Sequence, residues 1–199
     1  MLKGAMNELS IGDPWNLTTD VGPVIDETAR AGIQDHIDTA RMDGRVLHAL
    51  TAPVVDTFIA PTAIRVDGIS DLTHEIFGPV LHIATYKSSD LNKVITDINA
   101  TGYGLTFGLH TRIDDRVQQV VANIHAGNIY VNRNQIGAVV GSQPFGGEGL
   151  SGTGPKAGGP LYMPRFAVMM EVQPIPSPEP VDLPGPTGES NRLSVHPRG

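Results

Sequence analysis

The sequence predicts an α/β fold in which helices flank a parallel sheet, and the order of its periodic segments supports this class. Apolar residues recur at helical spacing within 91–98 and again within 117–124. Runs typical of β-strands lie before, between and after these helices, at 80–86, 105–109 and 128–132. A strand–helix–strand–helix–strand order with short connections favours right-handed crossovers onto a parallel sheet.

Further helices and strands are expected nearer the N-terminus. Apolar spacing favours a short opening helix within residues 2–9. A longer helix is expected within 29–40, with Asp26 as its N-cap and Gly44 as its stop. Two strand segments, interrupted by a proline that cannot donate to a ladder, are expected at 58–60 and 63–66.

Composition divides the chain into a folded part and a tail. Nine of the 23 glycines lie within 137–159, and seven of the 16 prolines lie from Pro174 onward. Proline at every second position from 174 to 180 forbids helix and sheet interiors and favours extended, solvated chain. The sequence therefore predicts a folded domain over 1–171 and a proline-rich tail or linker over 172–199.

The composition also excludes several classes of protein. A formal net charge of −7 without any Lys/Arg-rich run argues against a nucleic-acid partner. No stretch approaches the roughly 20 apolar residues of a membrane helix, and no signal-peptide run opens the chain, so a cytoplasmic protein without a membrane segment is expected. The absence of cysteine excludes disulfides, thiolate metal sites and a cysteine nucleophile within this chain.

Signals for metal ions and phosphates are weak. The seven histidines fall in no H-x-H or H-x-x-x-H arrangement, so each is interpreted as a surface or hydrogen-bonded core residue and no metal site is predicted. Gly147–Gly152 fits the pattern G-x-G-x-x-G, whose mechanism requires a strand before it and a helix after it. Prolines stand close on both sides instead, so we reject it as a phosphate site.

The segment Glu75–Val80, E-I-F-G-P-V, is a stronger candidate for a functional site. A fixed carboxylate at Glu75 can accept two hydrogen bonds from a ribose diol, and the ring of Phe77 can pack against a planar cofactor. The competing interpretation is a solvated surface glutamate beside a core phenylalanine, which composition alone favours because glutamate is usually exposed.

The segment Gly137–Gly147, G-A-V-V-G-S-Q-P-F-G-G, is the second candidate. Its small residues leave backbone N–H groups unshielded, so Gly137 and Ala138 can bind an anion without lysine or arginine. A tight crossover loop whose glycines serve only backbone geometry explains the pattern equally well.

These two segments, in this order, resemble the aldehyde dehydrogenase superfamily. Glu75–Val80 matches its E-I-F-G-P-V motif, and residues 144–147, with Gly149 and Ser151–Gly152, match its later P-F-G-G…G…S-G pattern. The run 137–166 is similar to the glutamate-semialdehyde (1-pyrroline-5-carboxylate) dehydrogenase branch, and most of all to the dehydrogenase module of bifunctional proline-utilization proteins. The resemblance covers about residues 1–170.

The resemblance implies NAD as cofactor and L-glutamate 5-semialdehyde as substrate. Glu75 then accepts hydrogen bonds from the nicotinamide ribose, and Phe77 packs beside the nicotinamide. Gly137 and Ala138 hold the α-carboxylate of the substrate through backbone N–H groups, and the ring of Phe145 lines the part of the site that holds the aliphatic carbons. In this family a thiolate attacks the aldehyde, a hydride passes to NAD, and water hydrolyses the thioester.

The family's nucleophilic cysteine, oxyanion asparagine and general-base glutamate correspond to positions before Met1. The resemblance therefore implies a C-terminal portion of the catalytic domain, with no catalytic residue of its own and no activity as an isolated chain. It also implies a homo-oligomer in the full-length protein.

Other interpretations remain open at this point. A non-catalytic α/β module retained for assembly fits the missing cysteine equally well. An aldehyde dehydrogenase with another substrate is disfavoured by Gly137 and Ala138, because a substrate without an α-carboxylate needs no anchor there.

Overall fold

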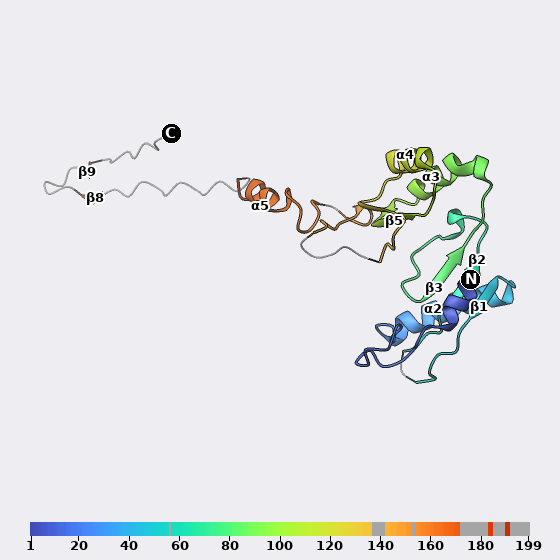
Figure 1. Ribbon diagram of the computed structural model, residues 1–199. Helices are drawn as coiled ribbons and strands as arrows, with labels where there is room; N and C mark the ends of the chain where they lie inside the picture. Colours follow the sequence, from blue (N-terminus) through green and yellow to red (C-terminus); the bar gives the residue numbers. More distant parts are fainter. Residues whose placement is uncertain (56, 137–141, 153, 172–182, 185–189, 192–199) are drawn as a thin grey trace. The chain divides into compact units, whose positions relative to one another are not determined.

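The computed structural model describes residues 1–55, 57–136, 142–152, 154–171, 183–184 and 190–191 (Figure 1). These residues form two units, which are described separately. The first unit holds residues 1–136 and 146–152, and the second holds 142–145 and the described residues from 154 onward.

The first unit begins with helices α1 (Leu2–Asn7) and α2 (Glu27–Met42). Asp26 caps α2 as expected, because its Oδ1 accepts a hydrogen bond of 2.7 Å from the Ala29 N–H. Gly44 follows the end of α2 with a φ of +66°, a left-handed conformation that favours glycine. Both predicted helices are thus confirmed.

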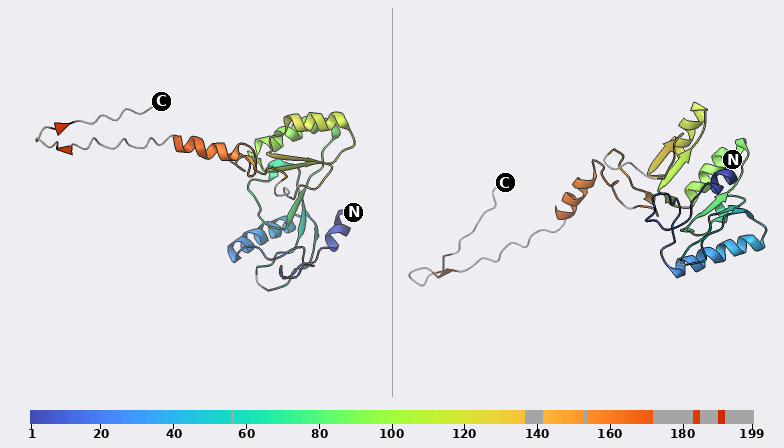
Figure 2. Two further views of the ribbon diagram at one scale, coloured as in Figure 1. Left: turned by 60° about the vertical axis from the view of Figure 1, so that its left-hand side comes forward. Right: turned by 60° about the horizontal axis from the view of Figure 1, so that its bottom comes forward.

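A three-stranded sheet follows α2 in the chain. Its strands are β1 (Val46–Ala49), β2 (Thr62–Arg65) and β3 (Val80–Ile83). β2 pairs antiparallel with β1 and parallel with β3. α2 lies along this sheet (Figure 2), because an apolar stripe on the helix is buried against it. The buried residues of this first core are Ile33, Ile37, Ala40, Ile59 and Ile64.

A strand–helix–strand crossover forms the rest of the first unit. Its elements are α3 (Leu91–Ala100), β5 (Thr106–Leu109), α4 (Asp114–Asn123) and β6 (Asn128–Val131). β5 pairs parallel with β6, as the periodicity predicts. α3 and α4 lie side by side (Figure 1), and their apolar faces share a second core whose buried residues are Ile95, Val120 and Ile124.

Short elements connect these parts. They are the 3₁₀ turns η1 (Ile69–Asp71) and η2 (Ser88–Asp90) and the two-residue strands β4 (Tyr103–Gly104) and β7 (Glu148–Gly149). β4 pairs antiparallel with β7 and brings the glycine-rich segment against the end of α3. A Cβ added to Gly127 would overlap the carbonyl oxygen of Gly146, so glycine is required where these backbones meet.

The second unit contains α5 (Tyr162–Glu171) and the short strands β8 (Leu183–Pro184) and β9 (Ser190–Asn191). Phe145 and Ala157 exchange two backbone hydrogen bonds, of 3.1 and 2.9 Å, in an antiparallel bridge. Within α5 the rings of Tyr162 and Phe166 meet edge to face with centroids 5.4 Å apart.

The α/β class is confirmed, but the strands differ from the expectation in three details. Residues 58–60 form no strand; Ile59 is 2% exposed and belongs to the first core instead. β1 was not expected, because its four residues are too short a run to show a clear alternation. β3 and β5 also pair with different partners, whereas the element order suggested one continuous parallel sheet.

Candidate functional site

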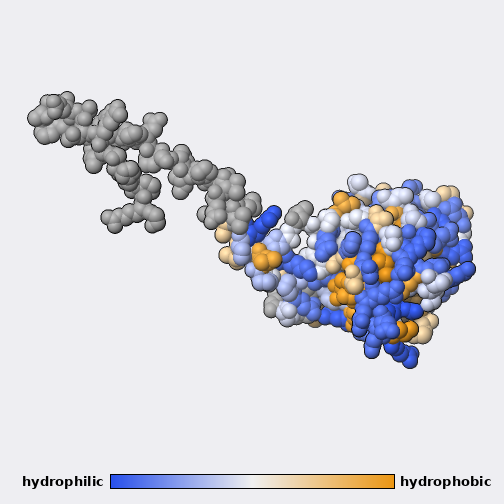
Figure 3. Space-filling view, turned by 90° about the horizontal axis from the view of Figure 1, so that it is seen from above, coloured by the Kyte–Doolittle hydropathy of each residue, from blue (hydrophilic) through white to orange (hydrophobic). Residues whose placement is uncertain are grey.

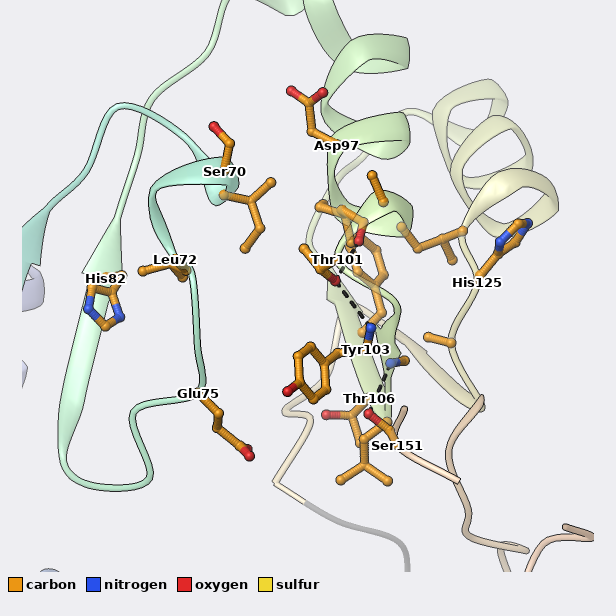
Figure 4. Close-up of a pocket in the computed structure, with 18 of the residues that line it drawn as sticks. Ser70, Leu72, Glu75, His82, Asp97, Thr101, Tyr103, Thr106, His125 and Ser151 are labelled. Atoms are coloured by element: carbon orange, nitrogen blue, oxygen red, sulfur yellow. Dashed lines mark hydrogen bonds between the residues drawn. The ribbon is translucent and has the colours of Figure 1, made fainter. Parts of the chain in front are cut away.

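A cavity of about 690 Å³ lies within the first unit, a volume typical of small-molecule sites (Figure 4). Its walls come from separate stretches of the chain. One wall is formed by residues 69–76 and His82 of β3. The other is formed by the end of α3, by β4 and β5, and by Ser151.

Glu75 lines this cavity. Its side chain is exposed and extends from its segment toward the side of the cavity that carries Tyr103 (Figure 4). Within the part of the chain that the structure describes, the Glu75 carboxylate has no hydrogen bond or ion pair, so its oxygens remain available as acceptors.

The backbone beside Glu75 is held against α2. Ile76 packs on the first core, and Gly78 approaches α2 so closely that an added Cβ would lie 2.6 Å from Ile33 Cδ1. The Gly78 N–H donates to Ile76 O at 3.0 Å and the Val80 N–H donates to Gly78 O at 2.8 Å. The Gly-Pro turn therefore ends the Glu75 segment at a defined point on β3.

The opposite wall offers hydroxyl groups and one aromatic ring. Thr101 Oγ1 accepts from the Tyr103 N–H at 3.2 Å, and Ser151 Oγ accepts from the Gly104 N–H at 3.0 Å (Figure 4). Tyr103 is 48% exposed, so part of its ring surface can contact a ligand. A carboxylate facing hydroxyls and a ring suits a ligand that carries both hydroxyl groups and a flat face.

Two other predicted site residues, Phe77 and Phe145, are not among the residues that line this cavity. Phe77 is 82% exposed and does not line it. Gly137 and Ala138 lie outside the described residues. Phe145 is partly buried and belongs to the second unit.

The structure agrees with the rejection of Gly147–Gly152 as a phosphate site. The segment forms β7 and a turn, and the next described helix, α5, begins only at Tyr162. The space beside Gly152 is occupied by the Gly147 carbonyl group, which shows that these glycines serve close packing of the backbone.

His82 is the cavity residue with a shifted pKa. Its Nε2 lies 2.8 Å from Nε2 of His36 on α2, so both rings are hydrogen-bonded, as the sequence analysis expected of the histidines. Burial is the main cause that lowers the pKa of His82, followed by the positive charges of His36 and Arg45. Among the described residues, no group of three or more His, Asp or Glu side chains could hold a metal ion.

Most of the cavity residues were not singled out by the sequence analysis. Asp97, Thr101, Tyr103 and His125 stand near the ends of helices and strands, where no periodic pattern marks them. Of these cavity residues, only Ser151 belongs to a sequence motif, because it lies within the S-G pair of the later pattern.

The comparisons with known proteins identify the family. The model of the aldehyde dehydrogenase family matches residues 1–172. The chain belongs to the aldehyde dehydrogenase family. The bifunctional protein PutA of Escherichia coli is 56% identical over 174 residues, which cover 83% of this chain and 13% of that protein. The 1-pyrroline-5-carboxylate dehydrogenase 1 of Halalkalibacterium halodurans is 41% identical over 78% of this chain and 30% of its own length.

Solved structures agree with this assignment. A crystal structure of proline utilization A from Bradyrhizobium japonicum matches with a TM-score of 0.79 and 50% identity, over 83% of this chain and 17% of that one. The expected family and its 1-pyrroline-5-carboxylate dehydrogenase branch are therefore confirmed. Members of the family are dehydrogenases that generally use NAD(P). None of the helices in the described residues is long and apolar enough to span a membrane.

Proposed function

We propose that this chain forms part of an NAD-dependent dehydrogenase that oxidises L-glutamate 5-semialdehyde to L-glutamate in proline catabolism. The observation that carries the proposal is the position of Glu75 on the wall of a cavity, at the start of the E-I-F-G-P-V segment. The relatives named as PutA and 1-pyrroline-5-carboxylate dehydrogenases support the reaction and the substrate.

The cavity chemistry suits the ribose next to the nicotinamide. In the proposal, the Glu75 carboxylate accepts hydrogen bonds from the ribose diol, while Thr101 and Ser151 offer hydroxyl groups on the facing wall. The exposed ring of Phe77 is available to pack beside the nicotinamide. NAD, when bound, supplies the acceptor for the hydride that leaves the aldehyde carbon.

We assign substrate recognition to the later segment. The backbone N–H groups of Gly137 and Ala138 are proposed to hold the α-carboxylate, and the ring of Phe145 to wall the aliphatic carbons. Within this scheme residues 1–171 belong to the catalytic domain, and 172–199 form a tail or linker.

The proposal includes a cytoplasmic homo-oligomer. Several large apolar side chains of the first unit are exposed, and the face drawn in Figure 3 shows apolar surface among polar surface. Trp15 is 91% exposed and Val54 is 101% exposed. Such residues support association with further protein surface.

The isolated chain is expected to show no dehydrogenase activity, because it contains no cysteine to attack the aldehyde. The measurement is NADH absorbance after NAD and glutamate semialdehyde are added to the purified chain, with heat-denatured chain as the control. Turnover above that control would contradict the assignment of a thiolate mechanism.

The function itself is tested in a chimera. The matching segment of Escherichia coli PutA is replaced by the residues of this chain, and substrate-dependent NADH formation is measured. We expect the chimera to retain activity and Glu75→Ala to slow single-turnover hydride transfer about 10- to 150-fold, the value of one hydrogen bond to a charged group. Glu8→Ala, which removes an exposed carboxylate outside the cavity, is the matched control. A folded but inactive chimera would favour the assembly module instead.

The substrate assignment is tested separately with Ala138→Pro in the same chimera. The substitution removes one N–H donor, which should cost about 1.5–3 kcal/mol of transition-state stabilisation. The value of kcat/KM for glutamate semialdehyde should therefore fall about 10- to 150-fold. Propanal has no carboxylate and should lose much less, whereas distortion of the loop would affect both aldehydes alike. Equal losses for the two substrates would contradict the assignment of Gly137 and Ala138 to binding of the α-carboxylate.

A further inference from the structure

One face of α2 contacts both the Glu75 segment and β3. Ile33 and His36 lie three positions apart, which places them on the same side of the helix. Ile33 meets Gly78, and the ring of His36 lies edge to face with the rings of His74 and His82, at centroid distances of 6.5 and 5.1 Å. A single helix face therefore contacts the Glu75 segment on both sides of Glu75.

The contact between His36 and His82 has the geometry of a hydrogen bond. Their Nε2 atoms are 2.8 Å apart and their ring planes are inclined by 72°. Because each Nε2 lies about 1.1 Å from its ring centre, a straight N–H···N arrangement predicts centroids about 5 Å apart. The observed 5.1 Å agrees with that arrangement.

The same distances differ from those of two rings that hold one metal ion. A tetrahedral ion with bonds of 2.0–2.1 Å would hold its two nitrogen ligands about 3.3 Å apart. A square arrangement would bring the ring centroids to about 4.5 Å. The observed separation of 2.8 Å is instead that of an N–H···N hydrogen bond, in which one ring donates to the other.

The number of protons on the pair decides whether the contact attracts or repels. When both imidazoles are neutral, one Nε2 can donate its N–H and the other Nε2 can accept it. The same hydrogen bond can form when only one of the two rings is protonated. When both rings are protonated, two N–H donors and two positive charges face each other, and no acceptor remains. The contact then turns from a bond between α2 and β3 into a repulsion.

The surroundings of the pair favour the neutral state. Burial is the largest cause that lowers the pKa of His36, followed by the charges of Arg45 and His74, and Asp35 on the same helix opposes them. Arg45 is itself paired with Asp43 at 2.9 Å. The pKa of His82 is lowered by burial, by His36 and by Arg45.

We propose that the His36–His82 pair is a proton-sensitive link, which holds β3 and the Glu75 segment against α2 and releases them when both rings are protonated. The link depends only on contacts within the first unit, and it stands whether or not Glu75 binds a ribose. Through this link, the attachment of the cavity wall that carries Glu75 depends on pH.

The sign of the pH dependence follows from the lowered pKa values. The unfolded chain binds more protons than the folded chain as the pH falls below about 6.5, so stability is complete above that pH and declines below it. We expect the unfolding equilibrium constant of the purified chain to rise about tenfold between pH 7.5 and pH 5.5. Urea unfolding at a series of pH values measures this, and amide hydrogen exchange of Gly78 and Val80, whose N–H groups are hydrogen-bonded, reports the release of the segment.

Two variants isolate the pair from the other titrating groups. His36→Gln keeps an N–H near the position of Nε2 but cannot be protonated, so most of this pH dependence should disappear. His48→Gln is the matched control, because His48 Nε2 contacts the non-titrating Asn7 Oδ1 at 2.7 Å, and it should behave as the unsubstituted chain does. An unchanged pH profile in His36→Gln would overturn the proposal.

A measurement on the unsubstituted chain keeps the test independent of how the variants fold. The ring resonances of all histidines are followed by NMR between pH 8 and pH 4. His36 and His82 should titrate in two separated steps, both below the value of about 6.5 for an unperturbed imidazole. If both rings titrate in a single step near the unperturbed value, the pair is not coupled and the proposal fails.

Discussion

The two walls of the cavity are built in different ways. The wall that carries Glu75 rests on side chains: Gly78 meets the tip of Ile33, and His74 meets the ring of His36. The opposite wall rests on backbone, because β4 pairs with β7 and Gly127 meets the carbonyl group of Gly146. Side-chain tips can rotate to relieve a contact, whereas hydrogen-bonded backbone cannot. The first wall can therefore adjust its position, and the second fixes the shape of the cavity.

The largest effect is expected from Gly127→Ala. Its Cβ would overlap the Gly146 carbonyl oxygen, and neither backbone can move without breaking the contact between β4 and the glycine-rich segment. The free energy of unfolding should fall by about 3 kcal/mol or more in urea titrations. A loss below about 1 kcal/mol would show that this wall also adjusts.

A smaller effect is expected from Gly78→Ala on the other wall. The new Cβ would meet the Cδ1 tip of Ile33, and we expect a loss of about 1–2 kcal/mol in the free energy of unfolding. Ile33→Val removes Cδ1 and should relieve the clash, so a double-mutant cycle should show a favourable coupling of about 1 kcal/mol. Strict additivity of the two substitutions would contradict the side-chain contact.

The support of the first wall by α2 is tested with Asp26→Ala. Loss of the N-cap bond to Ala29 should cost about 1 kcal/mol of unfolding free energy. Because α2 holds the Glu75 segment, amide exchange of the hydrogen-bonded Gly78 and Val80 should increase more than that of residues 102–104. Equal increases in both segments would mean that the two walls loosen as one.

The smallest effect is expected from Gly32→Ala, and it has the opposite sign. Gly32 lies within α2, and apart from the backbone of the helix itself no atom lies within 4 Å of an added Cβ. Alanine in a helix interior should raise the free energy of unfolding by about 0.5–1 kcal/mol. A loss of stability would show that the exposed side of α2 makes a further contact at Gly32.

The sequence predicts features that depend on neighbouring residues and misses those that depend on distant ones. The cap at Asp26, the turn at Gly44 and the faces of α3 and α4 follow from local spacing, and the structure confirms them. Which strands pair does not follow from spacing, so one continuous sheet was expected where β3 and β5 have separate partners.

The candidate site shows the same division. Glu75 was singled out by a motif of adjacent residues, whereas Tyr103 and Ser151 are brought to the same cavity by the pairing of β4 with β7. The contact of His36 with His82 spans two elements with no shared sequence pattern. Contacts of this kind are set by packing, and a single sequence does not display them.

The pairing of β4 with β7 also has a consequence for the order of folding. Tyr103 pairs with Gly149 across roughly twice the chain length that separates Thr106 from Asn128. Each doubling of a closed loop costs about 0.6 kcal/mol of chain entropy, so the β5–α4–β6 crossover should form first and the β4–β7 contact late. Contacts made after the folding transition state affect the unfolding rate rather than the folding rate. Gly149→Ala places a Cβ against the Gly102 carbonyl oxygen, next to this pairing, and should thus accelerate unfolding in stopped-flow experiments and leave the refolding rate nearly unchanged.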